Sequence, residues 1–523
     1  MFTSAFDVTR QTLLVLAPEL ILLLTATVMM TAGAFVRAPR RAWSIASAVA
    51  LALALVVLIA LRGETTDPYS AVALNDAFSY WSRIALVLSG LVLLALAHDQ
   101  VDDARAAEFF GSLLMFQAGA MLVASANELV FLFVGLELVS MPTYLLLYLS
   151  RRTTTTQEAA TKYFFLSIFS SGLLLFGLAY LYGLTGVTNL KALAYLAHYA
   201  PGGLQPNQAL IAIVFVMAGL GFRVAAVPFH FYAPDVYQGS PTIIAALLAW
   251  VPKAVGFLAI ARTLTAVISA SGQGALGSKA AMVAWIMAVA TMTLGNTVAL
   301  AQENLKRLLA YSSIAHAGYL MIGVAVAFRN EPGVENVYFG TEGILFYLAA
   351  YALMTLGAFG VILLLSTPEK PVETVADLAG LARTRPVVAL AMALCLFSLA
   401  GIPPMAGFWG KFELFASAFA VTSGSDARMY QWLAIIGVLN SAVGAYYYLR
   451  IVVGMYLRPS TAALVSKPAW PTLAAVGACA GLSLLLGLYP APIARATRSA
   501  AISAVEQPEP APEAPAVAGA IGR

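Results

Sequence analysis

About fourteen stretches of roughly 20 mostly apolar residues follow one another along this chain of 523 residues, separated by short polar loops. A helix needs about 20 such residues to cross the hydrocarbon layer of a membrane, because each residue advances it by about 1.5 Å. Only 10% of the residues are charged, against about 25% in soluble domains. We therefore predict an all-α polytopic membrane protein.

The predicted spans, numbered one to fourteen in chain order, cover residues 13–35, 43–61, 78–96, 109–125, 128–149, 162–182, 209–237, 243–264, 280–300, 308–327, 346–365, 386–419, 431–456 and 470–488. The amphipathic segment 188–198 is predicted to lie at the membrane interface. Residues 499–523 are rich in Ala, Pro and Glu, which predicts a disordered tail.

Spans seven and twelve are long and interrupted by proline and glycine, in GFRVAAVPFHFYAPDVYQG and SLAGIPPMAGFWGKF. An unbroken helix over 386–419 would measure about 50 Å, well beyond the ~30 Å hydrocarbon layer. Each proline removes a backbone donor and clashes with the preceding turn. We expect a break in mid-membrane in both spans, which requires surrounding protein or a wet cavity.

The two breaks occupy matching places in two groups of five spans. Spans four to eight (109–264) and nine to thirteen (280–457) each have a broken fourth member. A repeat with an odd number of spans enters the membrane with opposite orientation each time, which predicts two inverted repeats. A three-helix segment (1–108) precedes them, and a single helix (470–488) follows.

Loop charge predicts the orientation, because cytoplasmic loops carry an excess of Lys and Arg. One side has the larger share, including Arg37, Arg40, Arg41, Arg105, Arg151, Arg152, Lys306 and Arg307. That side is expected to face the cytoplasm. An even number of spans then places both termini on the outer, periplasmic side of a bacterial inner membrane.

Four ionisable residues lie inside apolar spans: Glu137, Arg223, Lys253 and Lys411. Each charge at the bilayer centre costs roughly 2.5–3.5 kcal/mol on insertion scales, so such residues usually face the protein interior and serve a function. The hypothesis is a path for protons, or for another small cation. Arg223 keeps its proton in proteins, so it suits a fixed counter-charge to Glu137. Lys411 either carries protons, caps carbonyl groups freed by the break or pairs with Glu413.

Three more residues are candidates for this path. His316 titrates near pH 6.5 and is placed to bridge Lys253 and Lys411. His230 follows Pro228 at the first predicted break, and Lys162 begins the sixth span. The alternative for His316 is a hydrogen-bonded interior histidine, and the alternative for Lys162 is a side chain that reaches the headgroups.

At these residues the chain resembles the antiporter-like subunits in the membrane arm of respiratory complex I, the proton-pumping NADH:quinone oxidoreductase. The segments that carry the resemblance are ELVFLFVGLELVSMPTYLL, PFHFYAPDVYQGSPT, GNTVALAQENLKRLLAYSSIAHAGYL and SLAGIPPMAGFWGKF, and APDVYQGSP favours the N type among these subunits. The resemblance implies functional roles for Glu137, Lys162, Lys253 and Lys411. Arg223 departs from the family, which usually has lysine there.

The resemblance implies a subunit that moves protons while quinone is reduced elsewhere in the complex. Its partners would be other membrane-arm subunits, further antiporter-like subunits among them, and lipids, but no nucleic acid. NAD, FMN, Fe–S clusters and quinone would belong to other subunits, with no cofactor and no redox chemistry in this chain. Two alternatives are a subunit of a multisubunit cation/proton antiporter and a non-pumping scaffold of the arm. Cys395 and Cys479 lack metal-ligand spacing.

Overall fold

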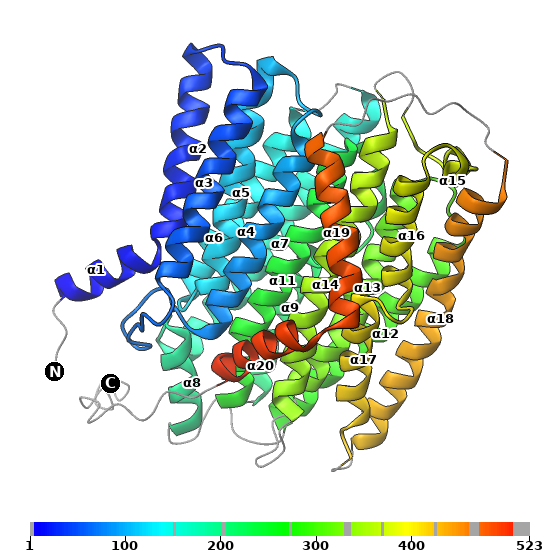
Figure 1. Cartoon of the computed structure of the whole chain (residues 1–523). Coiled ribbons are helices and arrows are strands. Elements are labelled where there is room, and N and C mark those ends of the chain that lie inside the picture. The colour runs from blue at the N-terminus through cyan, green and yellow to red at the C-terminus, as the bar shows by residue number, and fades with distance from the viewer. Residues whose placement is uncertain are drawn as a thin grey trace.

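The computed structural model describes residues 5–149, 153–199, 206–270, 275–328, 336–367, 371–422, 426–459 and 470–505. Over these ranges it contains twenty α-helices, two short 3-10 helices and no named β-strand. Thirteen helices are long and apolar enough to cross a membrane. Figure 1 shows them side by side in one bundle, as the sequence predicts for a polytopic membrane protein.

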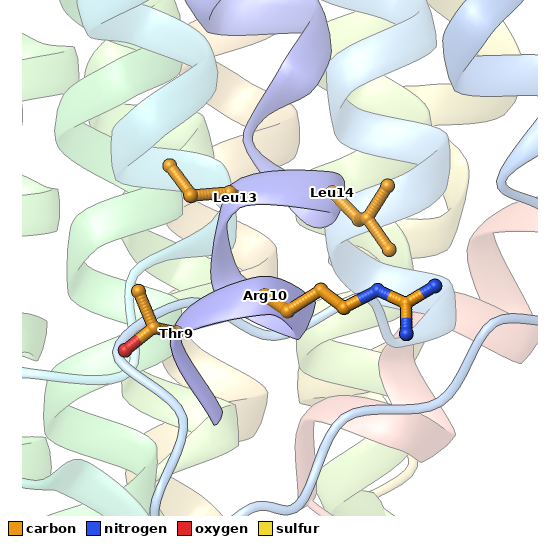
Figure 2. A pocket seen from close by; sticks show the side chains of 4 residues that line it. All are labelled: Thr9, Arg10, Leu13 and Leu14. Atoms are coloured by element: carbon orange, nitrogen blue, oxygen red, sulfur yellow. The ribbon is translucent and has the colours of Figure 1, made fainter. Parts of the chain in front are cut away.

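The N-terminal segment begins with a helix that the sequence analysis merged with the first span. A proline near the start of α2 separates the two, and the segment contains α1 (Ala5–Val15), α2 (Ala17–Phe35), α3 (Arg40–Ala60) and α4 (Ala77–Ala97). Helix α1 projects sideways from the lower end of the bundle in Figure 1. Figure 2 shows Thr9, Arg10, Leu13 and Leu14 around a pocket on α1. With leucines that are about half exposed, α1 has the character of an interfacial helix.

The first bundle contains α5 (Ala106–Ser125), α6 (Leu129–Tyr148), α7 (Thr154–Thr185), α8 (Leu190–Tyr199), α9 (Pro206–Arg223), α10 (Ala233–Gly239) and α11 (Thr242–Ala270). The second contains α12 (Ala275–Leu300), α13 (Leu305–Ala327), α14 (Asn336–Leu365), α15 (Leu381–Thr384), α16 (Pro386–Ala400), α17 (Ala406–Phe419) and α18 (Ala427–Leu457). The chain then continues into α19 (Trp470–Leu488) and α20 (Ala491–Val505).

Helix α20 corrects one expectation. The predicted disordered tail starts at 499, but the helix continues to Val505; residues 506–523 lie outside the described residues. Figure 1 shows α20 lying across the lower end of the bundle, where it packs on α4, α11 and α14. The Ser503 hydroxyl accepts a hydrogen bond from the Phe78 backbone at 2.9 Å, which ties this helix to the start of α4.

Both predicted breaks are confirmed. Span seven divides into α9 and α10, and Ala225 between them adopts the left-handed region with φ 56°. Span twelve divides into α16 and α17 after Gly401, whose φ of 84° suits glycine. Proline residues in each connection prevent the helix from continuing, because they lack the backbone donor.

The inverted repeats are confirmed by a matching pair of backbone contacts. The Leu129 N–H at the start of α6 donates to Thr188 O at 2.9 Å, and the Leu305 N–H at the start of α13 donates to Glu373 O at 2.7 Å. The first contact lies beside α8 and the second leads to α15. These two short helices are at opposite ends of the bundle in Figure 1. The same local structure therefore occurs twice, turned over.

Candidate functional site

The first element of the site is an ion pair between α6 and α9. Arg223 Nη2 lies 2.9 Å from Glu137 Oε1, and the two side chains are 4% and 21% exposed. Arg223 Nη1 also donates to Leu136 O at 3.0 Å and to Ser140 Oγ at 2.6 Å. The Ser171 hydroxyl donates to Glu137 Oε1 at 2.5 Å. The guanidinium is thus held in one geometry against the carboxylate.

Lys253 on α11 is a buried cation with no counter-ion among the ion pairs of the described residues. Its Nζ donates to Ser313 Oγ at 2.6 Å and to the carbonyl of the same residue. The Tyr351 ring centroid lies 5.1 Å away, within the range of a cation–π contact. Ser313 and Glu137 occupy corresponding positions of the two repeats, since each follows the start of its helix by the same interval. The amine of Lys253 therefore binds Ser313, the residue of the second repeat that corresponds to Glu137 of the first.

Helix α11, which carries Lys253, approaches the end of α9 closely at the first break. Gly256 lies one helical turn beyond Lys253 on α11, and a β-carbon on it would come 3.5 Å from Arg223 Cβ and 2.5 Å from a methyl group of Val224. The absence of a side chain allows α11 to approach the end of α9. The segment of α11 that follows Lys253 therefore packs on the end of α9 that carries Arg223.

His316 on α13 lies inside the second repeat and contacts two tyrosine hydroxyl groups. One ring nitrogen, Nε2, lies 2.9 Å from the Tyr448 hydroxyl, and Nδ1 contacts the Tyr347 hydroxyl. The Tyr448 hydroxyl also contacts Ser312 Oγ, next in sequence to Ser313. Groups that both donate and accept hydrogen bonds can pass a proton along, because each can bind one on one side and release one on the other.

Lys411 on α17 caps the end of α16. Its Nζ lies 2.9 Å from each of three acceptors, the carbonyl oxygens of Leu399 and Ala400 and the hydroxyl of Ser441. Of the alternatives drawn from the sequence, the capping of freed carbonyls is confirmed. The pairing with Glu413 is wrong, since no ion pair joins them in the described part of the chain.

Polar residues lie between Lys411 and α12. The Lys411 Nζ lies 5.0 Å from the Tyr319 ring centroid. Asn296 donates to the Tyr319 hydroxyl at 2.9 Å and accepts from Tyr447 at 3.0 Å. Tyr447 adjoins Tyr448 in sequence, so the Asn296 contacts and the His316 contacts lie next to each other between α13 and α18.

Lys162 lies outside this buried row. Helix α7 begins at Thr154, so Lys162 is about two turns inside the helix rather than at its start. Its side chain is 40% exposed and binds Glu158 at 2.6 Å and Asp235 at 2.8 Å. Asp235 also binds Arg307 at 2.7 Å, which joins α7, α10 and α13. The sequence analysis missed Asp235, although a carboxylate in the otherwise apolar span seven was a usable signal.

His230 lies at the first break, half-buried, and no hydrogen bond of its side chain to the row is found in the described residues. The structure therefore pairs Glu137 with Arg223, and it gives Lys253, His316 and Lys411 separate hydroxyl partners, which are Ser313, Tyr347 with Tyr448, and Ser441. It does not bring His230 or Lys162 into that set.

Two further charged pairs were missed because nothing in the sequence indicates which helix faces meet. Arg262, toward the far end of α11, binds Asp76 at 2.5 Å, and Arg83 binds Glu19 at 2.5 Å. Asp76 precedes the first residue of α4. Burial alone would raise the pKa of this carboxyl, but the charge and hydrogen bonds of Arg262 lower its pKa below the ordinary value.

With this geometry in view, comparison with known proteins decides the family. The model of the family described as "NADH:quinone oxidoreductase/Mrp antiporter, TM" matches residues 126–443, which span α6 to most of α18. The chain belongs to this family.

Close relatives of this chain occur among bacterial proteins. NADH-quinone oxidoreductase subunit N of Trichlorobacter lovleyi is 43% identical over 75% of this chain and 76% of its own length. The subunit N of Paramagnetospirillum magneticum is 36% identical over 92% of this chain and 96% of its own length. The alignment with the second relative thus covers nearly the whole of this chain.

Solved structures of other proteins have the same fold as this chain. A chain of respiratory complex I from Thermus thermophilus is 32% identical and covers 92% of this chain and 99% of its own, with a TM-score of 0.75. A chain of the Mrp complex from Dietzia, 20% identical, covers 95% and 98% with a TM-score of 0.79, which shows the shared fold alone.

Proposed function

We propose that this chain is the N-type membrane-arm subunit of a proton-translocating NADH:quinone oxidoreductase, and that it moves protons through its buried polar row. The relatives that support this bear the name of that subunit. The observation that carries the proposal is the row itself. Lys253, His316 and Lys411 are buried in mid-bundle and surrounded by hydroxyl and carbonyl groups, beside the Glu137–Arg223 pair.

In this proposal the Glu137–Arg223 pair acts as an electrostatic switch. Arginine does not release its proton, so the pair changes state by separation and not by proton transfer. When the guanidinium moves away from the carboxylate, its positive charge acts more strongly on Lys253. The absence of a counter-ion at Lys253 makes its proton the one most easily displaced by that field.

The released proton then passes through the second repeat. Ser313 accepts from Lys253, and Ser312, Tyr448 and His316 form the connected set beyond it. Lys411 is the terminal acceptor, at the break between α16 and α17. Broken backbone at this depth provides carbonyl groups that stabilise its charge, as in other transporters with discontinuous helices.

The setting of the subunit is part of the proposal. It lies in the bacterial inner membrane beside other membrane-arm subunits, with the Lys/Arg-rich loops in the cytoplasm and both termini outside. The bundles 109–264 and 280–457 are two halves of one path, preceded by the segment 1–108 and followed by the helix 470–488. NAD, FMN, Fe–S clusters and quinone are bound by other subunits. Lys162 and His230 serve at the edges of the path.

The experiment replaces Lys253 with Met in the assembled complex and measures proton uptake in vesicles during NADH oxidation. Loss of pumping is expected. The matched control is Lys279→Met, because Lys279 is an exposed lysine whose amine binds only Asn207 in the described residues. Full pumping by the Lys253→Met complex would overturn the proposal. Normal pumping with poor assembly would indicate a scaffold, and sodium transport by the chain alone would indicate a cation/proton antiporter.

A further inference from the structure

A second Glu–Arg pair is completely buried in the N-terminal helices, outside the polar row. Arg83 on α4 lies 2.5 Å from Glu19 on α2, and both side chains are 0% exposed. The same guanidinium nitrogen donates to Val15 O at 2.7 Å. An ion pair removed from water is usually no more stable than apolar side chains of the same size, so its stability alone does not explain it.

The pair has unused hydrogen-bonding capacity. Glu19 Oε1 and the Nε and Nη1 atoms of Arg83 have no hydrogen-bond partner in the described part of the chain. Leaving a buried charged group unsatisfied costs more free energy than leaving a neutral one unsatisfied. Internal waters commonly satisfy such groups, with about three hydrogen bonds each. The chemistry of these three atoms, one acceptor and two donors, fits water.

Polar groups lead from this pair to the end of α4. Ser79 lies one helical turn before Arg83, so the two share a face of α4. The hydroxyl of this fully buried serine also has no partner in the described residues. Its backbone N–H donates to Asp76 Oδ1 at 2.8 Å, and the Asp76 side chain is 20% exposed. This face of α4 therefore connects Glu19 with the end of the bundle where α20 lies.

The depth of Glu19 follows from the packing of α2 on α5. Gly33 lies against Ala107, and Ala26 lies against Gly111, so the two helices are antiparallel. Continuing in the same register places Glu19 level with the last two turns of α5.

Glu137 comes to the same level from the other side. Gly119, in the last two turns of α5, lies against Leu138 of α6, which follows Glu137 in sequence. Helix α5 packs on α2 and α4 as well as on α6 and α11. The two Glu–Arg pairs therefore lie at one depth, separated by a single helix.

We propose that Glu19, Arg83 and Ser79 form a water-binding site, which extends the proton path to the far side of α5. This role rests on the proposed proton translocation. The waters would donate to Glu19 Oε1 and accept from Arg83, and the face of α4 with Ser79 would connect them to Asp76. Through α5, the charge of this pair acts on the Glu137–Arg223 pair.

The first test is a high-resolution map of the assembled complex. Ordered water is expected between Arg83 Nη1 and Glu19 Oε1, and a dry site would overturn the inference. The second test is the double variant Glu19→Leu with Arg83→Met, which removes both charges together because one left alone is strongly destabilising. The double variant is expected to pump fewer protons per electron while electron transfer is retained. The single variant Glu19→Asp, which keeps the carboxylate, should pump normally.

A double variant that pumps normally would leave the pair a purely structural role and overturn the inference. If Lys253→Met also pumps normally, the proposed function fails with it. If only Lys253→Met loses pumping, the proposed function stands and this extension fails. Should the double variant fail to assemble, the water map of the unmodified complex decides.

Discussion

At the scale of single residues, the central fact is that Arg223 occupies the position beside Glu137. A lysine would provide one nitrogen, whereas the guanidinium binds Glu137, Leu136 O and Ser140 at once. The guanidinium is therefore held by several contacts in this state, and it keeps its positive charge. In contrast, the amines of Lys253 and Lys411 donate to neutral oxygens and have no carboxylate partner in the described residues, which fits the proton exchange proposed for them.

Arg223→Met should destabilise the subunit by about 1–3 kcal/mol, because it leaves the partly buried Glu137 carboxylate without its charged partner. Adding Glu137→Gln should recover much of that loss, since the unpaired charge is then gone. Thermal unfolding of the purified complex, followed for both variants and for Glu137→Gln alone, measures the coupling between the two sites. Additive effects would contradict a direct pair.

Tyr448→Phe should slow proton pumping and lower stability by only about 1 kcal/mol, because it removes one hydroxyl that connects His316 with Ser312. Tyr446→Phe on the same helix is the control, since that side chain is 62% exposed. Pumping rates in vesicles at equal electron transfer compare the two. Equal rates would show that the Tyr448 hydroxyl takes no part.

At the scale of helices, the breaks are built from residues without side chains where two segments must touch. A β-carbon on Gly407 would come within 2.0 Å of Ser398 O, and one on Gly401 within 2.8 Å of Lys411 Cδ. Helix α17 can therefore return close to the end of α16, and this proximity places the Lys411 amine on the freed carbonyls.

Gly407→Ala should destabilise the subunit by roughly 1–3 kcal/mol, as overpacking does, and should displace Lys411. Gly481→Ala on α19 is the matched control, because nothing lies within 4 Å of its added β-carbon and alanine favours a helix. Thermal midpoints of the two complexes provide the comparison. A Gly407→Ala complex as stable as the control would contradict this packing argument.

At the scale of the whole molecule, α11 connects the parts. It contacts the first break at Gly256, binds the second repeat through Lys253, and binds the start of α4 through Arg262 and Asp76. Every residue of this helix from Ile243 to Leu264 is buried. Helix α11 therefore contacts both repeats and the N-terminal segment, as the proposed coupling requires.

The Asp76–Arg262 contact predicts a pH-dependent contribution to stability. The folded pKa of Asp76 is lowered, so its contribution is present above the unfolded value of about 3.9 and is lost as pH falls through the folded value. Asp76→Asn should lower the thermal midpoint at neutral pH. The difference from the unmodified protein should shrink in acid below about pH 4. A constant difference across that range would contradict the assignment.

Local sequence was sufficient to predict the spans, both breaks, the inverted repeats and the location of Glu137, Lys253 and Lys411 within the bundle. Apolar length, proline and glycine act within a few turns of the chain, so their consequences can be read without knowing the neighbours. The helix extension to Val505 was missed because α20 is held by tertiary contacts with α4, α11 and α14, and not by an apolar run of its own.

Contacts between distant helices were decided only by tertiary structure. Lys411 binds carbonyls and not Glu413, Lys162 binds Asp235 at the surface, and Glu19 binds Arg83 across 64 positions of sequence. Such pairings depend on which helix faces meet and at what depth, and small residues such as Gly119 and Gly256 set that packing. Hydropathy determines that a side chain is in the membrane, whereas the packing of neighbouring helices determines what it touches.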